Sequence, residues 1–310
     1  MDFTKSLFRK EFFIKAFQVI SGLIILPRIS PLSRLFAARN DALVVIRGAD
    51  LSKGTIENMV KKGFEAMGGI DRFIKKGMKV VIKPNIGWNS PPERAHNTNP
   101  YIVETVARMC RERGARVQVF DRTCNKASLC YVNSGIRKAA KNAGAAIEYI
   151  DSRRYRKVPV KKGLKQKYLY VYEDMIKADF VINIPIAKHH SLAQLTLSMK
   201  NLMGVLGGNR GDYHHNMDEN IVDFTKAIRT DLTIMDATRI LTDHGPSGGT
   251  LDDVKVMKTI IFGKNPVTVD AYTTTLFGRE PRSIGYIKLA GAEGMGEINV
   301  KKMRITHKTV

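Results

Sequence analysis

After Asn40 the chain repeatedly alternates short apolar runs with segments of helical spacing. Each apolar run has the length of a buried strand, and Pro, Gly or polar residues follow it. Such alternation favours a largely parallel sheet with helices on both faces. We therefore predict an α/β fold in which 41–310 form a single domain. The expected strands are 43–46, 79–83, 117–121, 146–150, 180–184, 232–236 and 259–263, and the expected helices are 56–73, 100–113, 134–143, 193–205, 266–276 and 284–290.

Residues 151–172 interrupt this alternation. They are basic and aromatic, with alternating Val and Tyr, and predict a β-hairpin excursion from the sheet. The whole chain is also basic, with a formal net charge of +22 at pH 7. Such a charge favours anionic partners, namely an anionic small molecule, an acidic membrane surface or nucleic acid. Nucleic acid is the least favoured, because no bZIP, zinc-finger, RRM or KH signature accompanies the basic residues.

Residues 1–40 have the order of an export signal. A charged start leads into the apolar stretch 16–26, and small residues follow at Ala37 and Ala38. The apolar stretch is short for a transmembrane helix. Arg9-Lys10 resembles a twin-arginine signal in which the second arginine is a lysine. The alternative is an amphipathic helix that lies on a membrane or packs on the domain. The protein is expected to be exported or membrane-associated if this leader works, and otherwise cytoplasmic.

Polar side chains follow four of the predicted strands, at the point where each strand ends. The carboxyl ends of parallel strands share one edge of a sheet, where ligands bind in open α/β folds. We therefore expect a site at this edge, although a single strand-terminal Asp often only caps the next helix. The polar residues at the four strand ends are Lys83 with Asn85, Asp121, Lys188 with His190, and Asp236.

An anionic small molecule is the ligand that these residues suit best. On the helix predicted at 193–205, Lys200 lies on the same face as Thr196 and Gly204. The alternative is a buried helix with one snorkelling lysine. Backbone N–H groups of the Gly-rich turn around Gly248 offer further anion contacts, although this turn could equally be an ordinary chain reversal. The expected anion-binding residues are Lys83, Asn85, Lys188, Asn201 and Gly248.

Histidines, cysteines and carboxylates add acid–base and metal-binding groups. His190, Lys200 and His214 are the candidate catalytic residues. Adjacent histidines on an extended chain point apart, so one of each pair should face a ligand. A transition metal is the cofactor that the remaining groups would suit, although Cys124 and Cys130 could equally form a disulfide or have no role. The candidate metal ligands are His190, His214, Asp121, Asp236, Cys124 and Cys130.

A set of short motifs resembles the bacterial and archaeal family called domain of unknown function 362. Members of that family are often described as iron–sulfur-centre proteins, because some carry added ferredoxin-type cysteine repeats. This chain has three cysteines and no such repeat, so the resemblance implies no cluster here. Exported members with a twin-arginine leader resemble it as well in the loop that contains Asp121-Arg-Thr-Cys-Asn125 and Cys130-Tyr131. The motifs that carry the resemblance are Val80-Val-Ile-Lys-Pro-Asn85, Asn97-Thr-Asn-Pro100, Lys188-His-His190, Lys200-Asn-Leu-Met-Gly204, His214, Gly245-Pro-Ser-Gly248 and Asn265-Pro-Val-Thr-Val-Asp270.

A second resemblance concerns the lactate racemase family, whose members present a histidine and, ten residues on, a lysine near a nickel-pincer nucleotide. His190 and Lys200 have this spacing. We therefore expect a small-molecule enzyme or cofactor-binding protein with an anion or metal site at the sheet edge, and with redox or proton-transfer chemistry. One alternative is a non-catalytic protein held on an acidic membrane by its N-terminus and basic charge. The other is nucleic-acid binding, which requires affinity that falls steeply with salt.

Overall fold

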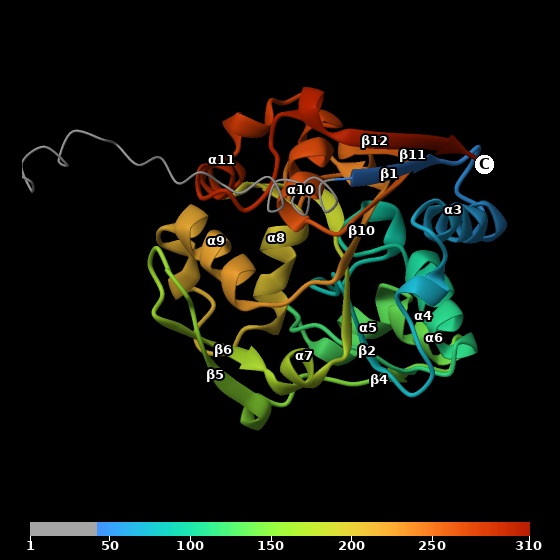
Figure 1. The fold of residues 1–310 in the computed structure, drawn as a ribbon, viewed down its shortest axis with the longest axis horizontal. Helices are drawn as coiled ribbons and strands as arrows, with labels where there is room; N and C mark the ends of the chain where they lie inside the picture. Colours follow the sequence, from blue (N-terminus) through green and yellow to red (C-terminus); the bar gives the residue numbers. More distant parts are fainter. Residues whose placement is uncertain (1–41) are drawn as a thin grey trace, which may run out of the picture. The chain divides into compact units, whose positions relative to one another are not determined.

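A computed structural model of the chain describes residues 42–310, and a ten-stranded mixed sheet forms its centre (Figure 1). Its strand order is β12-β1-β11-β10-β7-β2-β3-β4, and β8 and β9 extend it beside β10. The strands are β1 Ala42–Arg47, β2 Lys79–Pro84, β3 Arg116–Val119, β4 Ala146–Ile147, β7 Phe180–Ile184, β8 Ile186–His190, β9 Gln194–Thr196, β10 Leu232–Leu241, β11 Val254–Gly263 and β12 Arg304–Thr309.

The half of the sheet that contains β10, β7, β2, β3 and β4 is parallel throughout. This confirms the predicted α/β class with a largely parallel sheet. The other half differs, because β11 pairs antiparallel with both β1 and β10. Strands β10 and β11 are twice as long as predicted. Polar residues such as Thr238 and Lys255 interrupt their apolar pattern, and the pairing of β10 with β11 carries the strands past these residues.

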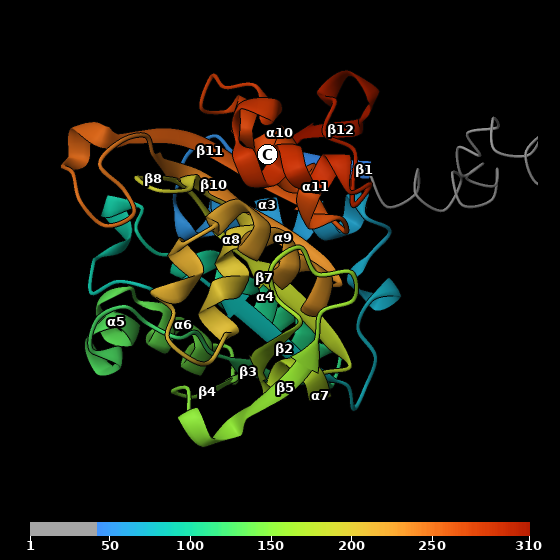
Figure 2. The ribbon, with the colours of Figure 1, turned by 90° about the vertical axis from the view of Figure 1, so that its left-hand side faces the viewer.

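Helices cover both faces of the sheet (Figures 1 and 2). Each face has its own hydrophobic core. Helices α3, α4 and α6 pack on one face, whereas α8, α9, α10 and α11 pack on the other. The described α-helices are α3 Lys53–Ala66, α4 Pro100–Glu112, α5 Ala127–Asn133, α6 Ile136–Asn142, α7 Glu173–Lys177, α8 Ser198–Asn201, α9 Met217–Ala227, α10 Pro266–Thr275 and α11 Gly285–Ala292.

The ends of α4 follow from its sequence. The Asn99 side chain accepts a hydrogen bond from the Tyr101 N–H at 3.0 Å, and Pro100 fills the first helical position. Gly114 ends the helix with φ of +76°, a conformation that glycine adopts without a steric cost. Helix α5 lies in a segment for which the sequence predicted neither a helix nor a strand. Its seven residues bury only two side chains, Cys130 and Tyr131, so no helical stripe marks it.

One predicted helix is wrong in a way that matters for the site. Residues 193–205 do not form one helix, because Gln194–Thr196 pairs as β9 with β8. Gln194 takes φ of +63°, which reverses the chain. Helix α8 then starts at Ser198 and passes into a 3₁₀ turn at Leu202–Val205. Lys188 and His190 consequently lie in strand β8 rather than in a loop.

The basic excursion forms the predicted hairpin, with β5 Tyr155–Pro159 paired antiparallel to β6 Tyr168–Tyr172. It is a separate two-stranded sheet. Within residues 42–310 no helix is both long and apolar enough to span a membrane. The predicted leader at 1–40 lies outside the described residues.

Candidate functional site

A cavity of about 400 Å³ opens at the carboxyl edge of the parallel strands. The end of β2, strands β8 and β9, helix α8 and the 3₁₀ turn after it form its walls, together with the loops after β2 and β3 and the loop before α9. The structure therefore brings together groups that lie far apart in the chain. The lining residues are Lys83, Asn85, Gly87, Trp88, Asp121, Arg122, Cys124, Lys188, His190, Ser191, Leu192, Thr196, Lys200, Asn201, Met203, Gly204, Arg210, His214 and Pro246.

A buried ion pair forms the base of this cavity. Lys83 Nζ lies 2.7 Å from Asp121 Oδ1, and the two side chains expose 0% and 3% of their surface. The second carboxylate oxygen accepts the Ile86 N–H at 2.7 Å. A Cβ at Gly204 would lie 1.9 Å from Asp121 Oδ1, so only glycine lets the 3₁₀ turn approach the pair. The pair therefore ties the ends of β2 and β3 to the segment that carries Lys200.

Asn201 connects this pair to the neighbouring strand. Its Oδ1 accepts hydrogen bonds from Lys83 Nζ at 3.2 Å and from Asn85 Nδ2 at 3.0 Å. Its amide nitrogen donates to Asn183 Oδ1 at 2.8 Å. Lys83 and Asn85 thus both donate to the same oxygen of Asn201. Of the predicted anion-binding residues, these three stabilise the site by holding its parts together.

Two other lysines line the cavity without a carboxylate. Lys188 is 1% exposed; it donates to the His96 carbonyl, and its Nζ lies 5.9 Å from the centroid of the Trp88 ring. Lys200 is 6% exposed, and its ammonium has neither a hydrogen-bond partner nor an ion pair among residues 42–310. Burial lowers the pKa of Lys188 to about 7 and that of Lys200 to about 8. The cavity therefore contains positive charge that the described residues do not neutralise.

His190 and His214 present different nitrogens to the cavity. His190 Nδ1 accepts the N–H groups of Leu192 and Ala193 at 3.1 and 3.2 Å. Burial, Lys200 and Lys188 together lower its pKa to about 2, so its ring is neutral and Nε2 carries the proton. His214 Nδ1 lies 3.0 Å from the Arg210 carbonyl, to which it donates, and Nε2 is left as an acceptor. The two rings stack at 6.4 Å between centroids.

A buried carboxylate outside the cavity fixes the start of α8. Asp270, on α10, accepts hydrogen bonds from the Ser198 N–H at 2.7 Å, the Met199 N–H at 2.9 Å and the Ser198 hydroxyl. These contacts satisfy the first backbone donors of the helix. Burial raises the pKa of Asp270 to about 7. The motif at 265–270 thus has a structural role, since Asn265 caps α10 and Asp270 positions the segment of Lys200.

The predicted metal ligands are not gathered into one set. Asp236 lies away from the cavity, where its carboxylate accepts the Asn99 and Thr238 N–H groups. Cys130 is buried in α5, whereas Cys124 reaches the cavity, and both are free thiols. In the part of the chain that the structure describes, no group of three His, Cys, Asp or Glu side chains is arranged to hold a metal ion. The six predicted ligands therefore do not form one coordination sphere.

One histidine of each adjacent pair and one predicted anion contact lie outside the cavity. His189 Nδ1 accepts the Gly245 N–H at 3.0 Å, and His215 does not line the cavity. The Gly248 N–H donates to the His244 carbonyl, and its own carbonyl accepts from His96 Nε2 at 3.1 Å. Gly248 therefore stabilises the loop and has no free N–H for an anion.

The sequence did not single out three residues that line the cavity, namely Trp88, Arg122 and Arg210. Arg210 donates to the carbonyls of Arg122 and Thr123 at 2.7 and 2.6 Å, and so closes one wall. All three lie in irregular segments, where no periodic pattern indicates which side chains face inward. In the sequence, only the high content of basic residues hinted that Arg122 and Arg210 could contribute to an anion site.

The fold and the site define an α/β protein with a positively charged cavity at the carboxyl edge of its sheet. The family model of the domain of unknown function (DUF362) matches residues 80–275, which include the ion pair and the cavity lysines. The chain belongs to this family, as its motifs indicated.

The chain is similar to several proteins at low sequence identity. A thylakoid-associated protein of Synechocystis sp. (strain ATCC 27184 / PCC 6803 / Kazusa) is 24% identical over 257 residues, which are 77% of this chain and 75% of that protein. The lactate racemase apoprotein of Thermoanaerobacterium thermosaccharolyticum aligns at a TM-score of 0.40 and 11% identity, over 63% of this chain and 50% of its own. A Thermotoga maritima protein aligns at a TM-score of 0.40 and 10% identity, over 79% of this chain and 60% of its own.

Proposed function

We propose that this protein binds an anionic small molecule in the cavity and transfers a proton to or from it. The supporting observation is the pair of buried lysines, Lys188 and Lys200, which have no carboxylate partner among residues 42–310. A buried cation without an anion is costly, and a bound ligand that supplies the opposite charge would offset this cost. A phosphate or carboxylate group would supply it and would accept hydrogen bonds from both ammonium groups.

The imidazoles and Lys200 provide the proton-transfer groups of this proposal. His214 Nε2 has the lone pair of a general base, and His190 Nε2–H is a neutral donor. Lys200 has a pKa of about 8, so it can give up a proton near neutral pH. A bound anion would lie among these groups, because all three line the same cavity. A transition metal is a less supported proposal, since His190 Nδ1 already accepts two backbone N–H groups.

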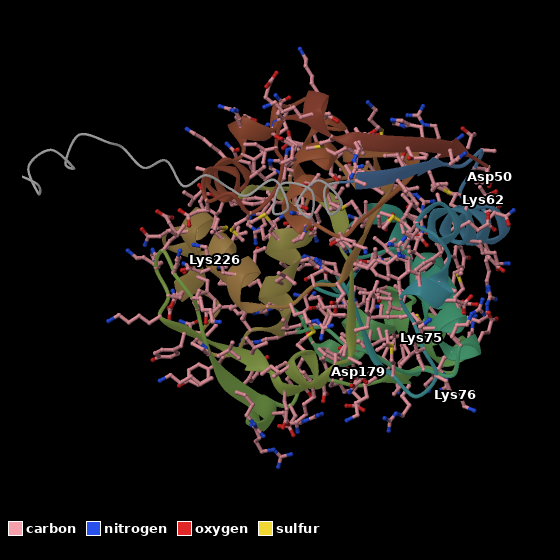
Figure 3. The ribbon with its side chains drawn as sticks, viewed as in Figure 1. Asp50, Lys62, Lys75, Lys76, Asp179 and Lys226 are labelled. Atoms are coloured by element: carbon pink, nitrogen blue, oxygen red, sulfur yellow. The ribbon has the colours of Figure 1, made fainter. Side chains whose placement is uncertain are left out.

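Replacing Lys200 by Met is expected to weaken sulfate and phosphate binding at least about tenfold, because it removes one charge-assisted hydrogen bond. Trp88 is the single tryptophan of the chain and lines the cavity, so its fluorescence reports binding. Lys76→Met is the matched control, because Lys76 is exposed at the periphery of the molecule (Figure 3). Equal anion affinities for the wild-type protein and Lys200→Met, or no binding by either, would overturn the proposal.

A second candidate function, attachment to an acidic membrane surface, is supported by the hairpin. No acidic residue occurs between Ser152 and Tyr172, whereas the tip carries four exposed lysines, at 161, 162, 165 and 167. The buried Asp223 carboxylate accepts the N–H groups of residues 164–166 at 2.7 to 2.8 Å and so fixes this tip. Leu164 stays 37% exposed among the lysines. The description of the Synechocystis relative as thylakoid-associated agrees with such a role.

Changing Lys161, Lys162 and Lys165 together to Glu is expected to reduce binding to phosphatidylglycerol vesicles at least about tenfold, since each basic residue at an acidic surface contributes about 1 kcal/mol. Co-sedimentation with vesicles measures the effect. The control changes Lys62, Lys75 and Lys76 to Glu, which alters the net charge by the same amount. These three lysines lie far from Lys226 of α9, which is in contact with the hairpin tip (Figure 3). Lys226 Nζ donates to the Lys162 carbonyl at 2.8 Å and so marks the hairpin tip. An equal loss of vesicle binding in both triple variants would show that the protein binds vesicles only through its net charge, and would contradict a specific role for the hairpin.

A further inference from the structure

A second cavity, of about 550 Å³, adjoins the anion site. Asp121 and Arg122 line both cavities, so the two spaces meet at these residues. Most of the remaining wall residues come from the hairpin and from the segment after β4, which lie at the same end of the molecule (Figures 1 and 2). The lining residues that the first cavity does not share are Thr123, Ala127, Tyr149, Ile150, Ser152, Tyr155, Tyr170 and Gly208.

Three tyrosines give this second cavity an aromatic character. Tyr149 and Tyr170 expose 44% and 42% of their surface, which is a large aromatic area to leave in contact with water. The Tyr155 ring packs against that of Tyr172, with 5.6 Å between the centroids. It also packs closely on Gly207, where a Cβ would lie only 2.8 Å from the ring. The cavity therefore has one partly buried ring and two exposed rings, each packed against a further tyrosine.

The hydroxyl of Tyr155 is buried and has no hydrogen-bond partner among the described residues. Burial raises its pKa to about 12, so it remains protonated and can donate. An unsatisfied buried hydroxyl is unfavourable in the free protein. A polar group on the edge of a ligand would satisfy it.

Arg122 forms the boundary between the two cavities. Its guanidinium donates to the Leu206 carbonyl at 2.7 Å and to the Gly208 carbonyl at 3.0 Å. These two contacts hold the guanidinium in one orientation. A planar cation of this kind favours stacking against an aromatic ring.

We propose that the second cavity binds a planar aromatic or heteroaromatic ring that is part of the same ligand as the anionic group. The ring would stack among Tyr149, Tyr170 and Arg122, and a polar group on its edge would bond to the Tyr155 hydroxyl. The ligand class is thus an aromatic phosphate or carboxylate. This inference rests on the proposed function, because the anion site fixes the other end of the ligand.

The affinities of matched phosphate esters test this inference, again through Trp88 fluorescence. The probes are methyl phosphate and the series phenyl, benzyl and 2-phenylethyl phosphate, in which the linker between ring and phosphate lengthens. At least one aromatic ester should bind about fivefold or more tightly than methyl phosphate, and more tightly than its cyclohexyl counterpart, which has similar size but no planar ring. Tyr170→Ala should remove this gain and leave the methyl phosphate affinity unchanged. Tyr101→Ala is the control, since Tyr101 is exposed to a similar extent (38%) and lines neither cavity.

The hydroxyl is tested with Tyr155→Phe. This change should weaken the binding of a hydroxyl-bearing aromatic ester and leave that of the unsubstituted ester unchanged. If methyl phosphate binds but no aromatic ester binds more tightly, the inference is wrong and the anion site stands. If the cyclohexyl esters gain as much as the aromatic ones, the cavity is only an apolar space and the aromatic assignment fails. If no phosphate ester binds, the proposed function itself fails.

Discussion

Asp121→Ala is expected to lower the free energy of unfolding by about 3–5 kcal/mol, because it leaves the Lys83 ammonium buried without its carboxylate. Lys83 is fully buried, and burial lowers the pKa of Lys83 while Asp121 opposes that effect. In the variant Lys83 can lose its proton, which limits the cost and makes it smaller at high pH. The change also removes the acceptor of the Ile86 N–H. Urea unfolding at pH 7 and pH 9 measures both effects.

Two further variants distinguish the lost charge pair from general damage. Lys83→Met combined with Asp121→Leu replaces the ion pair by apolar groups of similar size, and should recover most of the lost stability. Asp71→Ala breaks the exposed Arg113–Asp71 pair and should have little effect. If Asp121→Ala is as stable as the wild-type protein, Lys83 is not held as a buried cation. The bottom of the anion cavity would then not be formed by a buried Lys83–Asp121 ion pair.

The strand ends were the informative part of the sequence. Lys83 and Asp121 are 38 positions apart, yet each lies at the carboxyl end of a parallel strand, and that rule alone predicts that they meet. Lys188 and His190 were found in the same way, whereas Lys200 was selected from the face of a helix that starts later than predicted. Asp236 shows where the rule fails, because a strand-terminal carboxylate can equally serve backbone N–H groups, and the sequence does not distinguish the two uses.

The remaining errors have a common physical cause, which is contact with a segment that the local apolar pattern does not reveal. Leu195, Met199 and Leu202 have helical spacing, but Leu195 belongs to β9 because β8 offers it a partner strand. Asp270 fixes α8 from 72 positions away, and nothing local to Ser198 indicates this contact. Tertiary contacts override local periodicity in both places. The composition of the second cavity could not be predicted either, since its rings come from three separate segments.

Sulfate affinity is expected to fall about twentyfold between pH 6 and pH 8, because the two lysines that bind the anion lose protons in this range. At pH 8 about one-tenth of the Lys188 side chains and half of those of Lys200 would remain charged in the free protein. Sulfate itself stays doubly charged, so the change reports the protein. Because both pKa values are lowered, the two lysines of the free protein are partly deprotonated above pH 7, and sulfate binding must be accompanied by proton uptake there. Isothermal titration calorimetry in buffers of different ionisation enthalpy detects this uptake.

In Lys188→Met the decline in sulfate affinity should be centred near pH 8, and in Lys200→Met near pH 7. A flat profile from pH 6 to 8 with tight binding would show that the anion contacts neither lysine, and the charge in the cavity would then need another explanation.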